Sequence, residues 1–138
     1  MLKTVSKDVV KFITSGELEE LKKDPTYKAT AIYFKRLSKR EYDHYTGTLA
    51  EIRRGKFHSK IDEATKLLFE KCLCQNSEGV IVENAMVEGK FVEKITDKSQ
   101  AVEFLLELGD IESAGEIELA MKGQSVLSEE EEKNSDGR

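Results

Sequence analysis

The amino-acid sequence predicts an α+β fold: a single domain, mostly helical, with a small antiparallel sheet or hairpin. A short β-branched and aromatic run, Thr30 to Lys35, leads directly into a helix start at Ser38. Farther along the chain, apolar residues recur at the spacing of amphipathic helices. Apolar residues make up 38% and charged residues 36% of the chain, with a single proline, and this mixture favours helices with solvated outer faces.

The N-terminal segment predicts two short helices. The first is expected to be amphipathic and follows Ser6, with an apolar group formed by Val9, Val10, Phe12 and Ile13. The second is expected around Leu18 and Leu21. It should stop before Pro25, because proline disfavours helical geometry in the residue that precedes it.

The segment from Tyr27 to Leu37 has the β-branched and aromatic content of a strand. A lone strand would not be stable, so this one needs a partner. Two segments that follow a glycine are plausible partners, Val80 to Val82 and Lys90 to Val92. Glu83 to Met86 fits a strand or a loop equally well.

A helix is predicted from Ser38 onward. Ser38 and Glu41 have the spacing of a capping box, in which each side chain bonds the other residue's backbone N–H. Behind the cap, one apolar stripe comprises Tyr42, Tyr45, Leu49 and Ile52.

A second long helix is predicted after Ser59, which can cap it. Its stripe comprises Ile61, Ala64, Leu68 and Cys72, and Leu67 and Phe69 widen it toward full burial. We therefore expect this helix to be the central one.

Two helices are expected to close the domain. The first begins between Thr96 and Ser99 and has an apolar stripe of Val102, Leu105, Leu106 and Gly109, opposite Glu103, Glu107 and Asp110. The second runs from about Ile111 to Met121, with Ala114, Ile117 and either Ala120 or Met121 buried, and ends at Lys122 and Gly123. Residues 1–123 are thus expected to form the domain, and residues 124–138 a disordered acidic tail.

The chemistry-bearing residues predict neither an enzyme nor a cofactor site. No phosphate-binding loop, metal-ligand spacing or nucleophile–base set is present. Cys72 and Cys74 lie two apart on a helix and point in different directions, so we expect no disulfide. The Cys-x-Cys pair lacks the second cysteine or histidine pair that would complete four metal ligands, because the only histidines are His44 and His58, and we expect both histidines to be surface residues.

The apolar runs predict no membrane span. They are a few residues long, whereas a helix that crosses a bilayer needs about 20 residues. The N-terminus also lacks a hydrophobic signal core, so we expect a cytoplasmic protein.

Charge is distributed unevenly along the chain. Residues 27–60 carry nine basic and three acidic groups, whereas residues 61–138 carry eight basic and nineteen acidic groups. This asymmetry suggests a protein-binding surface, self-association included, more than a nucleic-acid site, because the whole chain is acidic. The residues that we predict to contact a partner are Tyr33, Lys35, Arg36, Lys39, Arg40, Tyr45, Arg53 and Arg54, with Lys56 in the same basic segment.

The block from Ala31 to Tyr42 resembles a passage of the small tail assembly chaperone-like proteins of bacteriophages and prophages. In both, an aromatic residue is followed by basic residues, a hydroxyl residue, and then an acidic and an aromatic residue. The resemblance covers residues 27–123 and extends to a later helix that ends near Cys72. The chain departs from the pattern at Leu37, where proline is frequent, and by a longer insertion from Gln75 to Lys94.

The resemblance implies a non-catalytic role. Such chaperones coat helical segments of the tape measure protein before the tail tube polymerises, so the implied partner is a tape measure or tail protein. Two other classes stay open: a structural protein of the phage particle, and a nucleic-acid-associated regulator that uses the basic residues 35–56.

Overall fold

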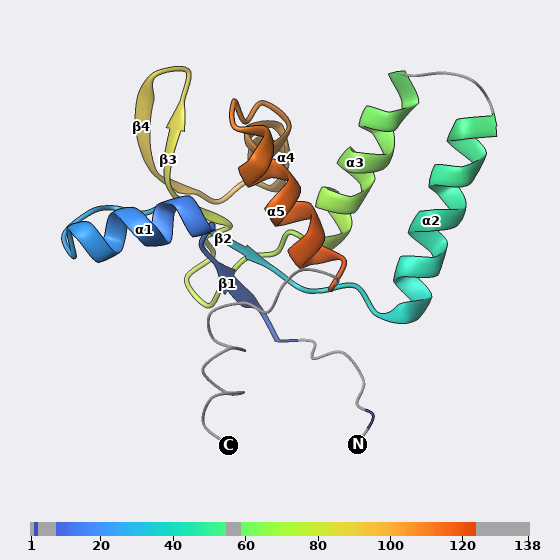
Figure 1. Ribbon diagram of the computed structural model, residues 1–138, viewed down its shortest axis with the longest axis horizontal. Helices are drawn as coiled ribbons and strands as arrows, with labels where there is room; N and C mark the ends of the chain where they lie inside the picture. The colour runs from blue at the N-terminus through green and yellow to red at the C-terminus, as the bar shows by residue number, and fades with distance from the viewer. Residues whose placement is uncertain (1, 3–7, 55–58, 124–138) are drawn as a thin grey trace.

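A computed structural model of the chain describes residues 2, 8–54 and 59–123, with the side chains of these residues except 48–54 and 59–64. In this part of the chain, four strands and five helices form an α+β fold (Figure 1). The strands are β1 (Val10–Phe12), β2 (Ala31–Phe34), β3 (Val82–Val87) and β4 (Lys90–Ile95). The helices are α1 (Ser15–Lys23), α2 (Lys39–Arg54), α3 (Ser59–Cys72), α4 (Lys98–Leu106) and α5 (Ile111–Met121).

The sheet is antiparallel, and its strands lie in chain order, β1-β2-β3-β4. β2 is the central strand and all four of its residues are buried. Ile32 and Phe34 face the main hydrophobic core, and Ala31 and Tyr33 are buried on the other face. β3 lies between β2 and β4 and pairs with both of them. The predicted antiparallel sheet is therefore confirmed.

The N-terminal apolar group forms a strand, so the helix predicted there is wrong. β1 pairs with β2, with Val10 opposite Phe34 and Phe12 opposite Ile32. The rings of Phe12 and Phe34 lie 5.8 Å apart between centroids, which anchors the short strand to the core. Cross-strand packing of this kind overrides a weak local helix preference.

The β3–β4 hairpin closes through a tight turn at Glu88 and Gly89, whose φ angles are +51° and +79°. Positive φ at both positions is the geometry that matches the twist of two-residue hairpins. The segment from Glu83 to Met86, which the sequence left open, belongs to strand β3. Within it Asn84 has φ +55°, and the buried residues Val82 and Ala85 are three positions apart, although the register with β4 continues without an inserted residue.

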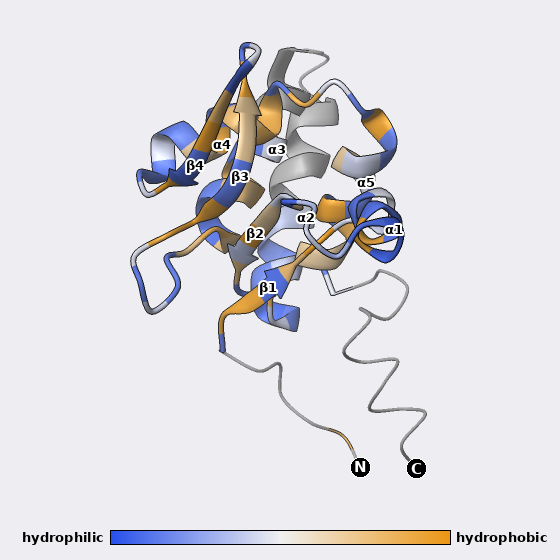
Figure 2. Ribbon diagram, turned by 90° about the vertical axis from the view of Figure 1, so that its left-hand side faces the viewer, coloured by the Kyte–Doolittle hydropathy of each residue, from blue (hydrophilic) through white to orange (hydrophobic). Residues whose placement is uncertain are grey.

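Helices α3, α4 and α5 pack against one face of the sheet. Figure 1 shows α2 and α3 as a pair at one end of the molecule, the β3–β4 hairpin at the other, and α4 and α5 between them. α3 contacts α2, α4 and α5, which makes it the central helix. α1 buries none of its residues and is hydrophilic over most of its length (Figure 2).

Most helix ends lie where the capping residues of the sequence predict them. The Ser38 N–H donates to Glu41 Oε1 at 3.0 Å, and the Glu41 N–H donates to Ser38 Oγ at 3.3 Å, which confirms the capping box. Asp97 and Asp110 cap α4 and α5 through their carboxylates. Gly123, with φ +71°, follows the C-cap of α5.

The core lies between one face of the sheet and α3, α4 and α5. Its fully buried side chains include Phe34, Leu68, Phe69, Leu73, Leu105, Ile117 and Met121. On α5 both Ala120 and Met121 are buried. α4 ends at Leu106, so Gly109 is exposed beyond the helix and does not extend the predicted stripe.

Some predictions fall on residues whose placement or side chains lie outside the description. They concern the side chains of Leu49, Ile52, Arg53, Arg54, Ile61 and Ala64, the residues Lys56 and His58, and the tail 124–138. Within the described ranges, every helix is too short or too polar to span a lipid bilayer.

Candidate protein-binding groove

The structure divides the predicted basic residues between the two ends of α2. Lys35 and Arg36 precede α2, and Lys39 and Arg40 lie in its first turn. Arg53 and Arg54 are its last two residues. Since a helix rises about 1.5 Å per residue, roughly 20 Å separates the two groups. The backbone therefore places the two groups at opposite ends of α2.

At the first of these ends, the charges are already partly paired. The Lys39 Nζ lies 2.7 Å from Asp43 Oδ2, and both side chains are exposed. An exposed pair of this kind contributes little to stability, because water and salt screen it. Lys35 and Arg40 are exposed, whereas Arg36 is half-buried.

The two tyrosines of the predicted site belong to the interior. Tyr33 is 8% exposed and its hydroxyl donates to Glu83 Oε1 at 2.6 Å. Burial, followed by this hydrogen bond, raises the pKa of Tyr33 to about 12. Tyr45 is 3% exposed, and the Lys122 Nζ lies 5.3 Å from its ring centroid, a cation–π contact between α5 and α2. Neither ring offers a surface to a partner.

The cysteines are free thiols in different surroundings. Cys72 is buried in the core and Cys74 is half-buried just after α3. Burial raises the pKa of Cys72 to about 12. Among the described residues, no three His, Cys, Asp or Glu side chains come together as metal ligands.

A groove that the sequence patterns did not predict lies between the β3–β4 hairpin and α4. Its volume is about 970 Å³. Figure 2 shows β4 and α4 side by side at this place. The hairpin contributes Met86, Val87, Glu88, Val92 and Ile95 to the lining, and the α4 segment contributes Ser99, Gln100, Glu103, Phe104, Glu107, Leu108 and Gly109.

The α4 segment presents two rows of side chains to the groove, each with a spacing of four residues. One row is polar and comprises Ser99, Glu103 and Glu107. The other comprises Gln100, Phe104 and Leu108, whose two apolar members are only half-buried. Within α4, residues four apart lie above one another. Glu107 and Leu108 directly follow the end of the helix at Leu106. The opposite side of α4, with Ala101, Val102 and Leu105, is buried in the core.

The hairpin completes an apolar floor. Val92 pairs with Ala85 across the two strands, and Ile95 pairs with Val82. Val87 and Val92 are half-buried against the core, and Ile95 is buried. Beside this floor, Met86 and its cross-strand partner Phe91 are 60% and 50% exposed. The groove therefore offers apolar side chains that only part of the fold covers.

Carboxylates stand on both sides of the apolar floor. Glu88 belongs to the hairpin turn, and Glu103 and Glu107 belong to the α4 segment. All three are exposed. The described residues that line the groove include no lysine, arginine or histidine. A partner that buried its apolar side chains here would place its flanking groups beside negative charge.

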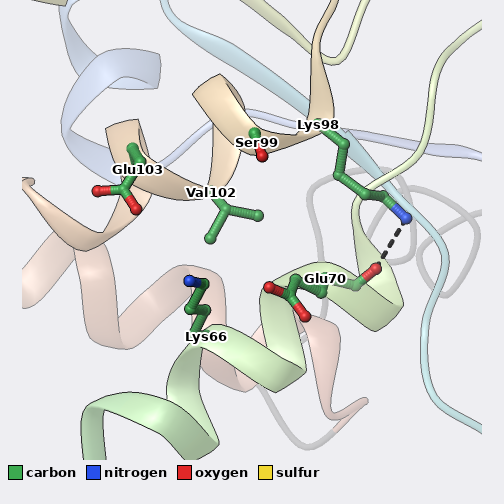
Figure 3. A pocket seen from close by; sticks show the side chains of 6 residues that line it. All are labelled: Lys66, Glu70, Lys98, Ser99, Val102 and Glu103. Atoms are coloured by element: carbon green, nitrogen blue, oxygen red, sulfur yellow. Dashed lines mark hydrogen bonds between the residues drawn. The ribbon is translucent and has the colours of Figure 1, made fainter.

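A smaller hollow of about 410 Å³ lies on the other side of α4, against α3 (Figure 3). It is lined by Lys66, Glu70, Lys98, Ser99, Val102 and Glu103, and the Lys98 Nζ donates to the Glu70 carbonyl at 2.8 Å. Ser99 and Glu103 line both hollows. With two ammonium groups and two carboxylates, the smaller hollow carries balanced charge.

One sequence signal was available for the groove. Phe104 is a large apolar residue that lies off the predicted core stripe of Val102 and Leu105. Leu108 repeats it one turn later. When a helix carries apolar residues outside the face that packs into the core, those residues indicate a second packing or binding surface.

Comparison of the chain with protein-family models, with curated proteins and with solved structures finds no match.

Proposed function

We propose that this protein is a non-enzymatic assembly chaperone of the phage tail type, which holds amphipathic helical segments of a tape measure protein. The groove between the β3–β4 hairpin and α4 carries the proposal, because it offers partly exposed apolar side chains between two structured walls. The resemblance of residues 31–42 to phage tail assembly chaperones supports the choice of client.

The dimensions of the groove suit a helix. α4 has nine residues, which corresponds to about 14 Å of helix. β4 has six residues, which corresponds to about 20 Å of strand. A helix of two to three turns, with apolar residues at i, i+3, i+4 and i+7, would therefore lie along both walls. Phe104, Leu108 and Val92 would contact its apolar face.

Such a short contact implies weak and reversible binding. An interface much smaller than about 1,200 Å² is typical of transient complexes. Release is what an assembly chaperone requires, since its client must later be handed to tail tube subunits. A client with many helical segments would then bind several copies of the chaperone, one at each segment.

Fluorescence of a helical peptide tests the groove. The chain contains no tryptophan, so a single tryptophan on the apolar face of an amphipathic peptide of about 14 residues reports binding alone. We expect a blue shift and saturable binding, and none with a scrambled peptide of equal composition. Phe104→Gln should weaken binding about tenfold, because the apolar anchor is lost.

Leu119→Gln is the matched control. Leu119 is 46% exposed on α5 and does not line the groove. Circular dichroism melts verify that both variants fold. If the amphipathic and scrambled peptides bind equally, or if the two variants behave alike, the groove is not the binding site.

The client assignment has its own test. Co-expression with the tape measure protein of the genome that encodes this chain should keep the tape measure protein soluble, and Phe104→Gln should reduce that effect. A tape measure protein that precipitates equally with and without the chain would contradict the assignment.

A further inference from the structure

We infer that the groove selects cationic amphipathic helices: helices whose apolar stripe is flanked on both sides by lysine or arginine. This inference rests on the proposed function and names the chemistry of the segment that the groove accepts. The observation behind it is the placement of Glu88 on one wall and of Glu103 and Glu107 on the other, around an apolar floor.

The acidic groups have a spacing that a helix can match. Glu103 and Glu107 are four positions apart on the α4 segment, and Glu107 closes the last turn of α4 as its C-cap, with its N–H donating to the Glu103 carbonyl at 3.0 Å. Side chains four apart on a helix lie roughly 6 Å from one another along the axis. Lysines at i and i+4 of a bound helix present the same repeat, which allows two ion pairs on this side.

Glu88 supplies the opposite wall. It lies at the hairpin turn with its side chain exposed, and the lining residues contain no basic group that would neutralise it. A helix whose stripe has basic residues on one side alone would satisfy Glu103 and Glu107 and leave Glu88 unpaired. Acidic residues beside the stripe would be repelled from both walls.

The wider charge distribution acts in the same direction. Residues 86–109, the stretch that supplies the lining, carry five acidic and three basic groups. The chain's own C-terminal segment contains Glu129 to Glu132 and thus has the wrong charge for this groove. A separate cationic segment is the occupant that the charges favour.

Two peptides that differ only in flanking charge test the inference. Both carry the same apolar stripe and one tryptophan over about 14 residues, and one has four lysines where the other has four glutamates. At about 0.1 M salt we expect the lysine peptide to bind at least fivefold more tightly. At about 1 M salt the Debye length falls from about 10 Å to about 3 Å, so the difference should shrink.

Variants that replace glutamate by glutamine show which carboxylates cause the preference for the lysine peptide. Glu103→Gln combined with Glu107→Gln should weaken the lysine peptide about fivefold, since two exposed ion pairs are lost. The same variant should leave the glutamate peptide equal or tighter. Glu19→Gln combined with Glu112→Gln removes the same net charge from exposed residues of α1 and α5 that do not line the groove, and should change little.

Every result that differs from these expectations contradicts the inference, and each one has a different meaning. Equal affinity for the two peptides would leave the proposed function standing and remove the charge selectivity. An equal loss in both double variants would mean that net charge, and not the groove rim, attracts the peptide. Binding of neither peptide would overturn the proposed function as well. Sedimentation that shows a dimer dissolved by Glu103→Gln with Glu107→Gln would assign the groove to a second copy of the chain.

Discussion

Glu116 of α5 caps the first turn of α1 from 101 positions away. The Ser15 N–H donates to Glu116 Oε1 at 2.8 Å, and the Ser15 Oγ donates to Glu116 Oε2 at 3.0 Å. Thr14, the N-cap residue, makes no side-chain capping bond. The carboxylate of Glu116 thus takes the place of a local cap at the positive end of the helix dipole.

Removing this remote cap should loosen α1. We expect Glu116→Ala to lower the free energy of unfolding by about 1 kcal/mol, the usual cost of a lost N-cap. Hydrogen exchange should accelerate in α1 more than in α3, because α1 buries no residue of its own. Glu118→Ala, on the same helix, is the control. Unchanged exchange in α1 would show that the two hydrogen bonds do not hold it.

The hairpin turn should gain stability when Glu88 is replaced. Glu88 has φ +51°, a conformation that asparagine adopts at lower cost. We expect Glu88→Asn to raise the free energy of unfolding by about 0.5 kcal/mol and to weaken the lysine peptide at the same time. A denaturant titration and the peptide titration measure the two effects. Lys90→Asn, beyond the turn, should not stabilise the fold.

The core face of α3 is tested by a pair of substitutions. Leu68 is 0% exposed, so Leu68→Ala should cost about 2–5 kcal/mol of stability. Lys66 is exposed, and Lys66→Ala should be nearly neutral. Urea unfolding measures both. Small and equal effects would mean that α3 buries a different face.

The two thiols should react at different rates. Burial raises the pKa of Cys72 to about 12, and Cys72 is 1% exposed. Burial also raises the pKa of Cys74, but Cys74 is half-buried. At about pH 8 we expect iodoacetamide to modify Cys74 first, and Cys72 only after unfolding, because the thiolate is the reactive form. Mass spectrometry of the digested protein reads both sites, and faster labelling of Cys72 would contradict its burial.

Tyr33 should make stability fall in alkaline solution. Its pKa in the folded protein is about 12, above the value of 10.0 for a free tyrosine. The stabilisation is therefore complete below about pH 10 and is lost as the pH rises toward 12. Tyr33→Phe should flatten this part of the pH dependence of the free energy of unfolding. Tyr27→Phe should flatten the same part of the pH dependence, since the hydrogen bond to Glu17 likewise raises the pKa of Tyr27 to about 12.

The features that could be predicted from the sequence are those that neighbouring residues determine. The capping box at Ser38 and Glu41 depends on residues three apart, and it forms as predicted. The end of α1 follows from Pro25, and the end of α5 from Gly123. β1 could not be predicted in this way, because three residues carry no clear period and their strand conformation depends on pairing with β2, a distant segment of the chain.

The candidate site could not be found from charge along the chain. Lys39 and Arg54 lie in one basic segment of the sequence but at opposite ends of one helix. Tyr33 and Tyr45, which suggested an aromatic contact surface, are buried. The groove depends on β4 lying beside α4, and neither element alone shows that a space remains between them.

The groove is built from one continuous stretch of chain, since its lining runs from Met86 to Gly109. Among the residues whose side chains the structure describes, none from β1, β2, α2 or α3 lines the groove. Under the proposed function, the preference of the groove for a client would therefore depend on a single short gene segment, whose inward face on α4 must fit the core at Ala101, Val102 and Leu105. Exchanging that segment between related chains would transfer a binding preference as a unit and leave the remaining scaffold as it is.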